Sequence, residues 1–208
     1  FDGLERPVQN IDVGASAQNG RDIVSFVEYD DMGRSDVISY LPYVVSSAGN
    51  NGMKIADPVT QQRSFWQSFL PAGDPDKDYA YAQKQYDDSP LGVVLKQGGV
   101  GISKNLNTGK SINYRYTKNT ASEIKDFRVG NDGTLIYKGF HPANTLTVRR
   151  TYTGEGTDAE DSDKYEYVNP LGQVIASEVR ISASDRRITY YVYPGEPDND
   201  CRSHLSVQ

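Results

Sequence analysis

The sequence is poor in the residues that build metal and catalytic centres. Its 208 residues include one cysteine, Cys201, and two histidines, His141 and His204. One cysteine excludes both an internal disulfide and a cysteine cage for zinc. Because His204 belongs to the C-terminal segment, a histidine pair would require that segment to fold back onto the chain. We therefore expect no metal site, no cofactor and no nucleophile activated by histidine.

Long apolar runs and excess positive charge are also missing. No stretch approaches the ~18 apolar residues of a membrane-spanning helix. The 22 Lys and Arg residues against 28 Asp and Glu residues give a formal net charge of -6. A negative chain repels nucleic-acid phosphates unless basic residues gather on one face. We therefore expect no membrane span in this segment and no nucleic-acid partner.

The sequence is rich in tyrosine, with 15 residues, and in glycine, with 19. Tyrosine suits a pleated, half-buried surface, and glycine suits turns. A chain of this length can bury its own core. The composition and the many alternating segments predict a mainly β fold, in which antiparallel hairpins form an elongated sheet. We expect a single β domain over residues 1–193 and a polar C-terminal tail over 194–208.

One segment has a helical pattern. Asp57 suits an N-cap, and Pro58 suits the first helical position. Beyond them an apolar stripe with one polar break recurs at three- and four-residue steps, and its members are Val59, Gln62, Phe65, Trp66, Phe69 and Leu70. The pattern predicts one short helix near residues 58–70 that packs on a sheet.

The segment EYDDMGR at 28–34 has the strongest turn signal. Asp30 can accept hydrogen bonds from the N–H groups that follow it. Gly33 can adopt the left-handed conformation that other residues resist by about 1 kcal/mol or more. Because apolar runs flank this turn at 23–29 and 35–41, the pattern predicts a β-hairpin. Asp132-Gly133 lies between alternating runs and predicts a second tight hairpin.

The turn belongs to an internal repeat of four segments, FDGLERPVQNI, YDDMGRSDVI, DSPLGVVL and VNPLGQVIA. Gly33, Gly92 and Gly172 mark three copies, 59 and 80 residues apart, so insertions separate them. Glu5 takes the glycine position in the first copy and predicts either a different turn or a strained one. The predicted structural turn residues are Asp2, Asp30, Gly33, Arg34, Gly92, Asp132, Gly133, Asn169 and Gly172.

These residues resemble a known family. FDGLERP and EYDDMGR are similar to the aromatic-Asp-x-x-Gly-Arg signature of RHS or YD-repeat proteins. The segments FDGLERPVQ, VEYDDMGR, YLPY, SPLGVVLKQG, NDGTL and TYYVY, in this order, resemble the uncharacterised domain that precedes the RHS core in large bacterial cell-surface proteins. The resemblance covers residues 1 to about 193.

The resemblance implies a β-rich scaffold in which repeats wind hairpins into a hollow shell around a C-terminal toxin or effector. It implies a secreted or cell-surface location, no catalytic residues, and the rest of the shell or its cargo as partners. After TYYVY the family continues into another YD turn, whereas this chain continues into PGEPDNDCRSHLSVQ. That departure predicts a truncated or frameshifted relative.

Two short segments invite a chemical interpretation. NTGKS at 107–111 ends like a phosphate-binding loop, but Lys104 replaces the first glycine and a strand pattern follows, so we expect a plain turn. The acidic segment 154–163 could supply oxygen ligands to calcium, but it lacks EF-hand spacing. We expect a solvated hairpin loop there.

The aromatic residues leave an alternative function open. Most should pack within the core or across strands. Trp66, Tyr79 and Tyr81 are candidates for stacking on a glycan, which would make the chain a carbohydrate-binding β module. A glycosidase with two carboxylates is the least favoured hypothesis. The sequence predicts a noncatalytic structural segment and no enzyme.

Overall fold

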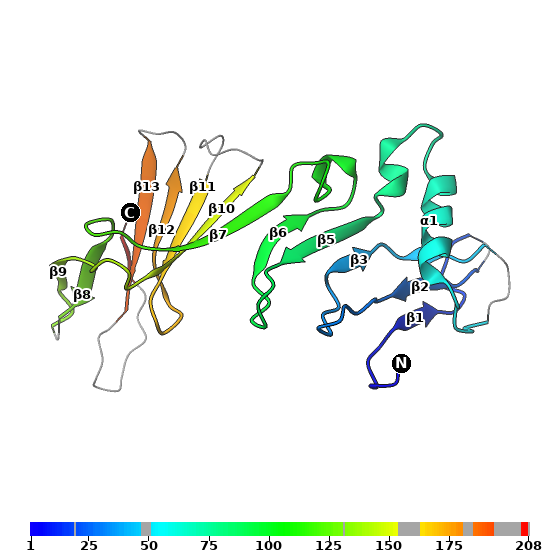
Figure 1. The fold of residues 1–208 in the computed structure, drawn as a ribbon, viewed down its shortest axis with the longest axis horizontal. Coiled ribbons are helices and arrows are strands. Elements are labelled where there is room, and N and C mark those ends of the chain that lie inside the picture. The colour runs from blue at the N-terminus through cyan, green and yellow to red at the C-terminus, as the bar shows by residue number, and fades with distance from the viewer. Residues whose placement is uncertain are drawn as a thin grey trace. The chain divides into compact units, whose positions relative to one another are not determined.

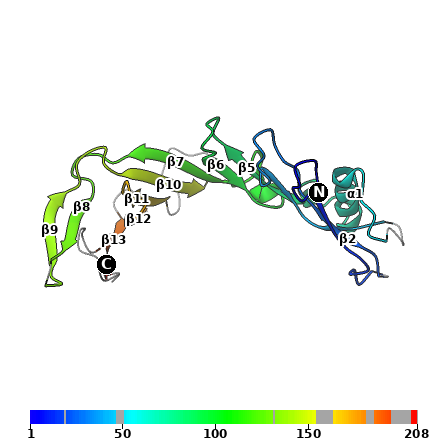
Figure 2. The ribbon, with the colours of Figure 1, turned by 90° about the horizontal axis from the view of Figure 1, so that it is seen from below.

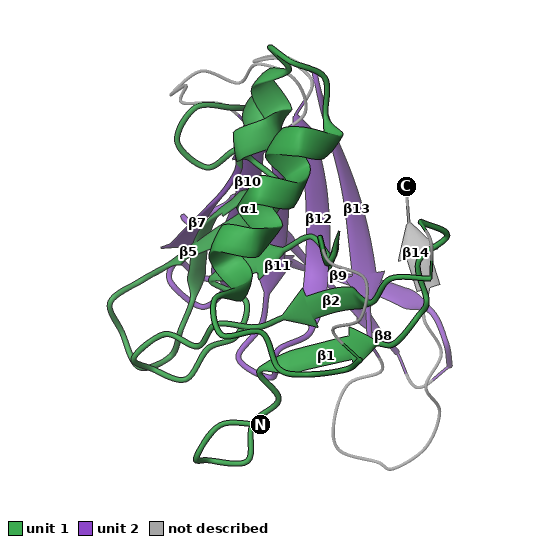
Figure 3. Ribbon diagram, turned by 90° about the vertical axis from the view of Figure 1, so that its right-hand side faces the viewer, with its two compact units in different colours: residues 1–111 green, residues 112–208 purple. Residues whose placement is uncertain are grey.

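The computed structural model describes residues 1–18, 20–46, 51–130, 132–153, 163–180, 185–193 and 205–207. The fold is mainly β, with antiparallel pairing and one α-helix in the described residues, as the sequence predicts. The chain divides into two compact units, Phe1–Ser111 and Ile112–Gln208 (Figure 3), where the sequence predicted one domain over 1–193. Each unit buries a hydrophobic cluster of its own, which explains the division.

Unit 1 begins with a small antiparallel sheet. Its spatial order is β1 (Gln9–Asp12), β2 (Ile23–Phe26) and β4 (Tyr43–Val44). Figure 1 shows β1 beside β2. Burial alternates along β2, where Val24 and Phe26 are buried and their neighbours are half-buried. This alternation places Val24 and Phe26 in the core with Tyr43.

A second group of strands completes the β structure of unit 1. β5 (Tyr81–Tyr86) pairs antiparallel with β3 (Ile38–Tyr40) and with β6 (Val94–Gly98). Short 3-10 turns occupy Pro75–Asp78 and Ile102–Lys104.

The helix α1 (Pro58–Phe69) confirms the helix predicted near residues 58–70 and ends one residue earlier, with Leu70 as its C-cap. Asp57 caps it, because its carboxylate accepts the N–H of Thr60 at 3.0 Å. Gln62, the polar break of the stripe, is the buried residue of the helix, and its side-chain amide donates to the carbonyl of Ala80 at 2.8 Å. By contrast, Phe69 is 55% exposed. The helix contacts β4, and no helix in the described residues is long and apolar enough to cross a membrane.

Unit 2 is built on antiparallel strands. Their spatial order is β7 (Ile112–Lys118), β10 (Thr147–Thr153), β11 (Asp163–Val168), β12 (Val174–Arg180), β13 (Arg186–Val192) and β14 (Leu205–Val207). The strand β14 falls within the segment predicted to be a polar tail, since Leu205–Val207 pair with β13. The rest of that segment, 194–204 and 208, lies outside the described residues.

The predicted hairpin around Asp132-Gly133 is confirmed. β8 (Lys125–Val129) and β9 (Leu135–Phe140) pair antiparallel with a bulge at Asp126/Phe127 (Figure 2). β8 also contacts β13, where the rings of Phe127 and Tyr190 meet edge to face at 5.0 Å. The core of unit 2 lies on the sheet and consists of Ile124, Leu146, Val148, Tyr167 and Ala176.

The hairpin predicted between 23–29 and 35–41 is wrong as a strand pairing. The chain reverses at Asp30–Arg34, but β2 pairs with β1 and β4, whereas β3 pairs with β5. Contacts outside the turn set the pairing. The residues of β3 pair with β5 at Ile38↔Gln83, Ser39↔Ala82 and Tyr40↔Tyr81, so β3 is joined to a strand that lies far along the chain.

Candidate functional site

The turn Asp30–Arg34 is held together by its first residue. The N–H groups of Met32 and Arg34 donate to Asp30 Oδ1 at 3.0 and 2.8 Å, and Arg34 Nε donates to Oδ2 at 2.7 Å. The N–H of Gly33 donates to the Asp30 carbonyl at 2.8 Å. Both carboxylate oxygens of Asp30 therefore serve the turn itself.

The first copy of the turn, Asp2–Arg6, repeats these contacts. Asp2 Oδ1 accepts the N–H groups of Leu4 and Arg6 at 2.9 and 3.0 Å, and Oδ2 accepts Arg6 Nε at 2.8 Å. Glu5 has φ 60°, close to the 77° of Gly33. Of the two predicted outcomes, the structure shows the strained one, in which a glutamate adopts the left-handed conformation of a glycine.

The fourth copy replaces the aspartate with Asn169. Asn169 Oδ1 accepts the N–H groups of Leu171 and Gln173 at 3.0 and 2.9 Å, and its amide group donates to Gln173 Oε1 at 2.8 Å. Gly172 has φ 80°. This turn joins β11 to β12 as a true hairpin.

The third copy is a variant in which Ser89 holds the first position and Gly92 has φ 60°. Ser89 Oγ accepts the N–H of Leu91 at 3.3 Å. The closing contact comes from Asp87, whose carboxylate accepts the N–H of Val93 at 2.9 Å. Val93 stands where the first two copies have arginine.

The hairpin loop between β8 and β9 has the same backbone form. The N–H of Gly133 donates to the carbonyl of Gly130 at 2.9 Å, and Gly133 has φ 80°. Asp132 Oδ1 accepts the N–H of Thr134 at 3.1 Å. The four-copy repeat in the sequence does not include this loop, because Gly130 stands where the other turns have an aspartate or another polar residue.

Consecutive turns of unit 1 contact one another through an arginine and an aromatic ring. The Arg6 guanidinium carbon lies 4.0 Å from the centre of the Tyr29 ring, and that of Arg34 lies 4.3 Å from the Tyr86 ring. Tyr29 directly precedes Asp30, and Tyr86 directly precedes Asp87. Each arginine thus packs on the aromatic residue that introduces the next turn, at cation–π distance. We call the first three turns and these two contacts the turn stack.

The tyrosine hydroxyls of the turn stack are also fixed. Tyr29 donates to the carbonyl of Pro7 at 3.0 Å. Tyr86 donates to Asp36 Oδ1 at 2.6 Å, and Lys84 Nζ lies 2.6 Å from Asp36 Oδ2. Pro7 directly follows the first turn, and Asp36 lies two residues beyond the second, so each tyrosine is bound at its face and at its hydroxyl.

The turn carboxylates have perturbed acidities. Hydrogen bonds from the side chain and backbone of Arg6 lower the pKa of Asp2 to about 2. The backbone N–H of Arg34, assisted by its guanidinium, lowers the pKa of Asp30 below its ordinary value. Burial and the neighbouring Asp36 raise the pKa of Tyr86 to about 12. These residues are therefore charged aspartates and a protonated tyrosine at neutral pH.

The three aromatic residues predicted for glycan stacking do not form one platform. Trp66 packs edge to face with Phe65 and Phe69 of the same helix. Tyr79 and Tyr81 lie 6.4 Å apart between ring centres, and Tyr81 alone of the three lines a small groove with Tyr40. The structure therefore does not bring the predicted set together.

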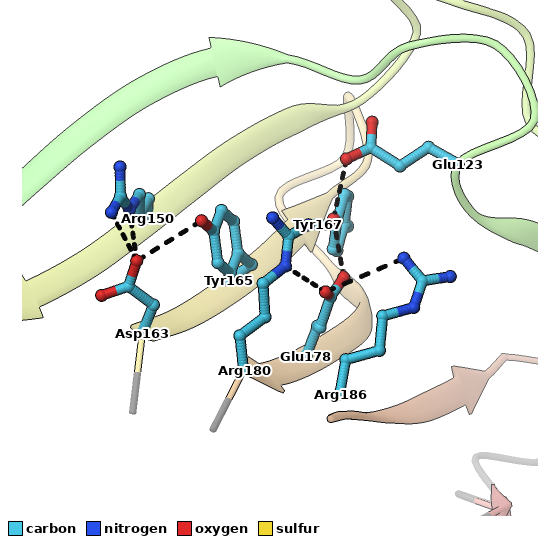
Figure 4. A network of polar contacts seen from close by, with 8 residues as sticks. All are labelled: Glu123, Arg150, Asp163, Tyr165, Tyr167, Glu178, Arg180 and Arg186. Carbon is cyan, nitrogen blue, oxygen red and sulfur yellow. Dashed lines mark hydrogen bonds and ion pairs between the residues drawn. The ribbon is translucent and has the colours of Figure 1, made fainter. Parts of the chain in front are cut away.

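Unit 2 contains a buried polar network that the sequence did not indicate (Figure 4). Glu178 and Tyr167 are fully buried. The Tyr167 hydroxyl lies 2.9 Å from Glu123 Oε1 and 3.1 Å from Glu178 Oε2. Glu178 also pairs with Arg180, and Arg186 lies 3.9 Å from its Oε1. Because a tyrosine stands between the two carboxylates, this pair is not arranged to flank a glycosidic bond.

The other buried carboxylate of the network is Asp163. Arg150 Nε donates to its Oδ2 at 2.7 Å, and the same guanidinium lies 4.5 Å from the centre of the Tyr152 ring. Arg180 lies 4.0 Å above the Tyr165 ring. Each buried carboxylate is thus paired with an arginine, and that arginine packs on an aromatic ring. Alternation along β11 could have indicated these positions, but it does not reveal which charges are paired.

A groove of about 310 Å³ lies between β8, β13 and the Asn169 turn of unit 2. Phe127, Tyr190 and Tyr191 line it together with polar side chains that include Asp126 and His141. His141 Nε2 lies 3.9 Å from Asp126 Oδ1, and burial lowers the pKa of His141 below its ordinary 6.5. The groove combines aromatic faces with hydrogen-bonding groups. The described residues contain no cluster of potential metal ligands.

Two further sequence predictions concern loops. A strand, β7, and not a helix, follows NTGKS, in line with a plain turn and against a phosphate-binding loop. Of the acidic segment, 154–162 lie outside the described residues. Asp163 at its end belongs to the buried network.

Residues 1–118 match the model of a family described as a domain of unknown function, DUF6443. The match spans more than half of the chain, so the chain belongs to this family. No curated protein matches it. The matched residues include the entire turn stack.

Proposed function

We propose that this member of the DUF6443 family is a noncatalytic structural segment of an exported RHS/YD-repeat protein. The observation that carries the proposal is the turn stack, in which Arg6 contacts Tyr29 and Arg34 contacts Tyr86 in the same way. A contact that recurs between successive copies of a motif is what a repeat scaffold needs, because each copy must bury surface against the next.

Every position of the aromatic-Asp-x-x-Gly-Arg signature has a structural role in the turn stack. The aspartate binds the N–H groups of its own turn and holds its own arginine. The glycine adopts the left-handed conformation. The arginine contacts the next turn, and the aromatic residue receives the arginine of the previous one. The signature is thus accounted for by folding, without a substrate.

The DNA that follows this chain's coding sequence and the location of the protein in producing cells together test this proposal. We expect the DNA that follows the codon of Gln208 to encode further aromatic-Asp-x-x-Gly-Arg turns in one of its three frames, and antiserum against the chain to detect it in the exported fraction of producing cells. Flanking DNA without such turns in any frame, together with a chain confined to the cytoplasm, would contradict the proposal.

A carbohydrate-binding β module is the second candidate, and the groove of unit 2 favours it. Phe127, Tyr190 and Tyr191 supply aromatic faces, and Asp126 and Arg128 supply hydrogen-bonding groups along the same groove. Tyr191 is 36% exposed, so its ring is accessible to a ligand. Exposed aromatic faces beside polar groups suit a sugar ring.

A glycan array separates the two sites that aromatic residues could form. Binding in this groove predicts that Tyr191→Ala abolishes the signal and that Trp66→Ala keeps it, with circular dichroism confirming that both variants fold. Loss of signal in Trp66→Ala alone would move the site to α1. An array without any signal for the full chain would remove this candidate.

A further inference from the structure

A cavity of about 560 Å³ lies in unit 1 between α1, β4 and the segment that leads into β2. Its volume falls within the range of ~300–1,000 Å³ that is typical of small-molecule sites. From the helix it is lined by Thr60, Ser64 and Ser68, which follow one another at four-residue steps and so share one face. Phe65 and Phe69 add apolar surface. The cavity is distinct from the turn stack and from the groove of unit 2.

Two residues that line this cavity each carry a buried polar atom without a hydrogen-bond partner. Arg21 Nε and the Tyr43 hydroxyl are both buried and form no hydrogen bond, and Arg21 forms no ion pair with a described residue. Tyr43 as a whole is 1% exposed. A buried donor without an acceptor is unfavourable, and such groups are rare in native proteins. Two of them on one cavity are explained if a bound molecule supplies the acceptor.

The chemistry of the two orphan groups defines that molecule. A guanidinium group binds carboxylate and phosphate oxygens with paired hydrogen bonds. Burial, and to a lesser extent Asp57, raises the pKa of Tyr43 to about 12, so its hydroxyl is protonated and can donate at neutral pH. Val44 and the two phenylalanines offer the remainder of the ligand an apolar surface.

We propose that this cavity binds an organic oxyanion, with Arg21 and Tyr43 donating to its oxygens and Phe65 and Phe69 packing against an apolar or aromatic body. The hydroxyl group of Ser64 adds a further polar group to the site, whereas the hydroxyl of Ser68 donates to the carbonyl of Phe65 at 2.9 Å. The site would give a chain that we otherwise propose to be structural a specific small-molecule ligand.

Titration of the full 208-residue chain with sodium benzoate tests the proposal, followed by amide chemical shifts in two-dimensional NMR. Benzamide, which has the same shape without the charge, is the matched ligand control, and phenyl phosphate is the second oxyanion. We expect saturable shifts at Ser64 and Ser68 with benzoate and a dissociation constant about tenfold larger for benzamide. The tighter binding of benzoate or of phenyl phosphate identifies the oxyanion class.

Substitutions locate the site. Arg21→Gln should weaken benzoate binding at least about tenfold and remove the preference over benzamide. Tyr43→Phe, which deletes one oxygen, should weaken it about threefold and provides a second test if Arg21→Gln does not fold. Arg63→Gln is the matched control, since it removes an arginine from α1, one wall of the cavity, but Arg63 lines a different groove. No saturable shift with either oxyanion, equal affinity for benzoate and benzamide, or unchanged binding in folded Arg21→Gln would overturn the proposal.

Discussion

The guanidinium carbon of Arg34 lies 4.3 Å from the centre of the Tyr86 ring, and this contact joins the turn at Asp30 to the segment that leads into the turn at Ser89. Arg34 is held in place by two hydrogen bonds from its own turn to Asp30. Tyr86 is held by its hydroxyl on Asp36. Since each side chain is also restricted by a second partner, the contact itself costs little additional side-chain entropy.

Glu5 provides the simplest test of the turn conformation. Its φ of 60° is unfavourable for glutamate and free of steric cost for glycine. Glu5→Gly should therefore raise the free energy of unfolding by up to about 1 kcal/mol, as measured by urea denaturation. The reciprocal change, Gly33→Ala, should lower it, because the new side chain is strained at φ 77° and its Cβ would lie 3.3 Å from an Arg6 nitrogen. A clear loss of stability in Glu5→Gly would contradict the assignment of this turn.

The aspartates of EYDDMGR predict a difference in acid stability between two neighbours. The pKa of Asp30 is lower in the folded chain than the ordinary 3.8, so the unfolded chain binds more protons just below that pH. Its contribution to stability is complete above pH 3.8 and is lost as the pH falls through its folded pKa.

Asp30→Asn should therefore flatten the dependence of the urea midpoint on pH below about 4. Asp31→Asn is the matched control, because Asp31 is exposed and makes none of the turn contacts. If the urea midpoint of the two variants depended on pH in the same way, the Asp30 contacts would not be formed in solution.

The buried network of unit 2 predicts an unequal cost for two ionic substitutions. Glu178 is fully buried and neutralises Arg180, so Glu178→Ala should lower the free energy of unfolding by about 3 kcal/mol. Arg128→Ala removes the pair with Asp126, but Arg128 is 61% exposed, so the loss should stay below about 1 kcal/mol. Urea denaturation of both variants measures the difference. Comparable losses would mean that Glu178 is solvated.

The sequence predicted those features that depend on neighbouring residues. Asp57 and Pro58 placed the helix, and Asp132-Gly133 placed the hairpin of β8 and β9. The turn at Gly33 was also predicted, because the side-chain and backbone groups that close it lie within five residues of one another.

The features that depend on distant residues were not predicted. The pairing of β3 with β5 joins segments about forty residues apart, and no local signal distinguishes it from pairing with β2. Gln62 appeared as a break in an apolar stripe, yet it is buried because the carbonyl of Ala80 accepts its amide. Glu178 and the groove beside Tyr191 likewise result from the assembly of separate strands.

The central claim is that the signature exists to join one turn to the next, and a double-mutant cycle on Arg34 and Tyr86 tests it most directly. Arg34→Gln, Tyr86→Leu and the double variant are unfolded in urea beside the unchanged chain. The cycle cancels the separate losses at Asp30 and Asp36.

Arg6 and Tyr86 serve as the control pair, because Arg6 packs on Tyr29 instead. We expect a coupling energy of about 0.5–1 kcal/mol for Arg34 with Tyr86 and none for the control pair. Equal and negligible coupling in the two cycles would contradict the claim.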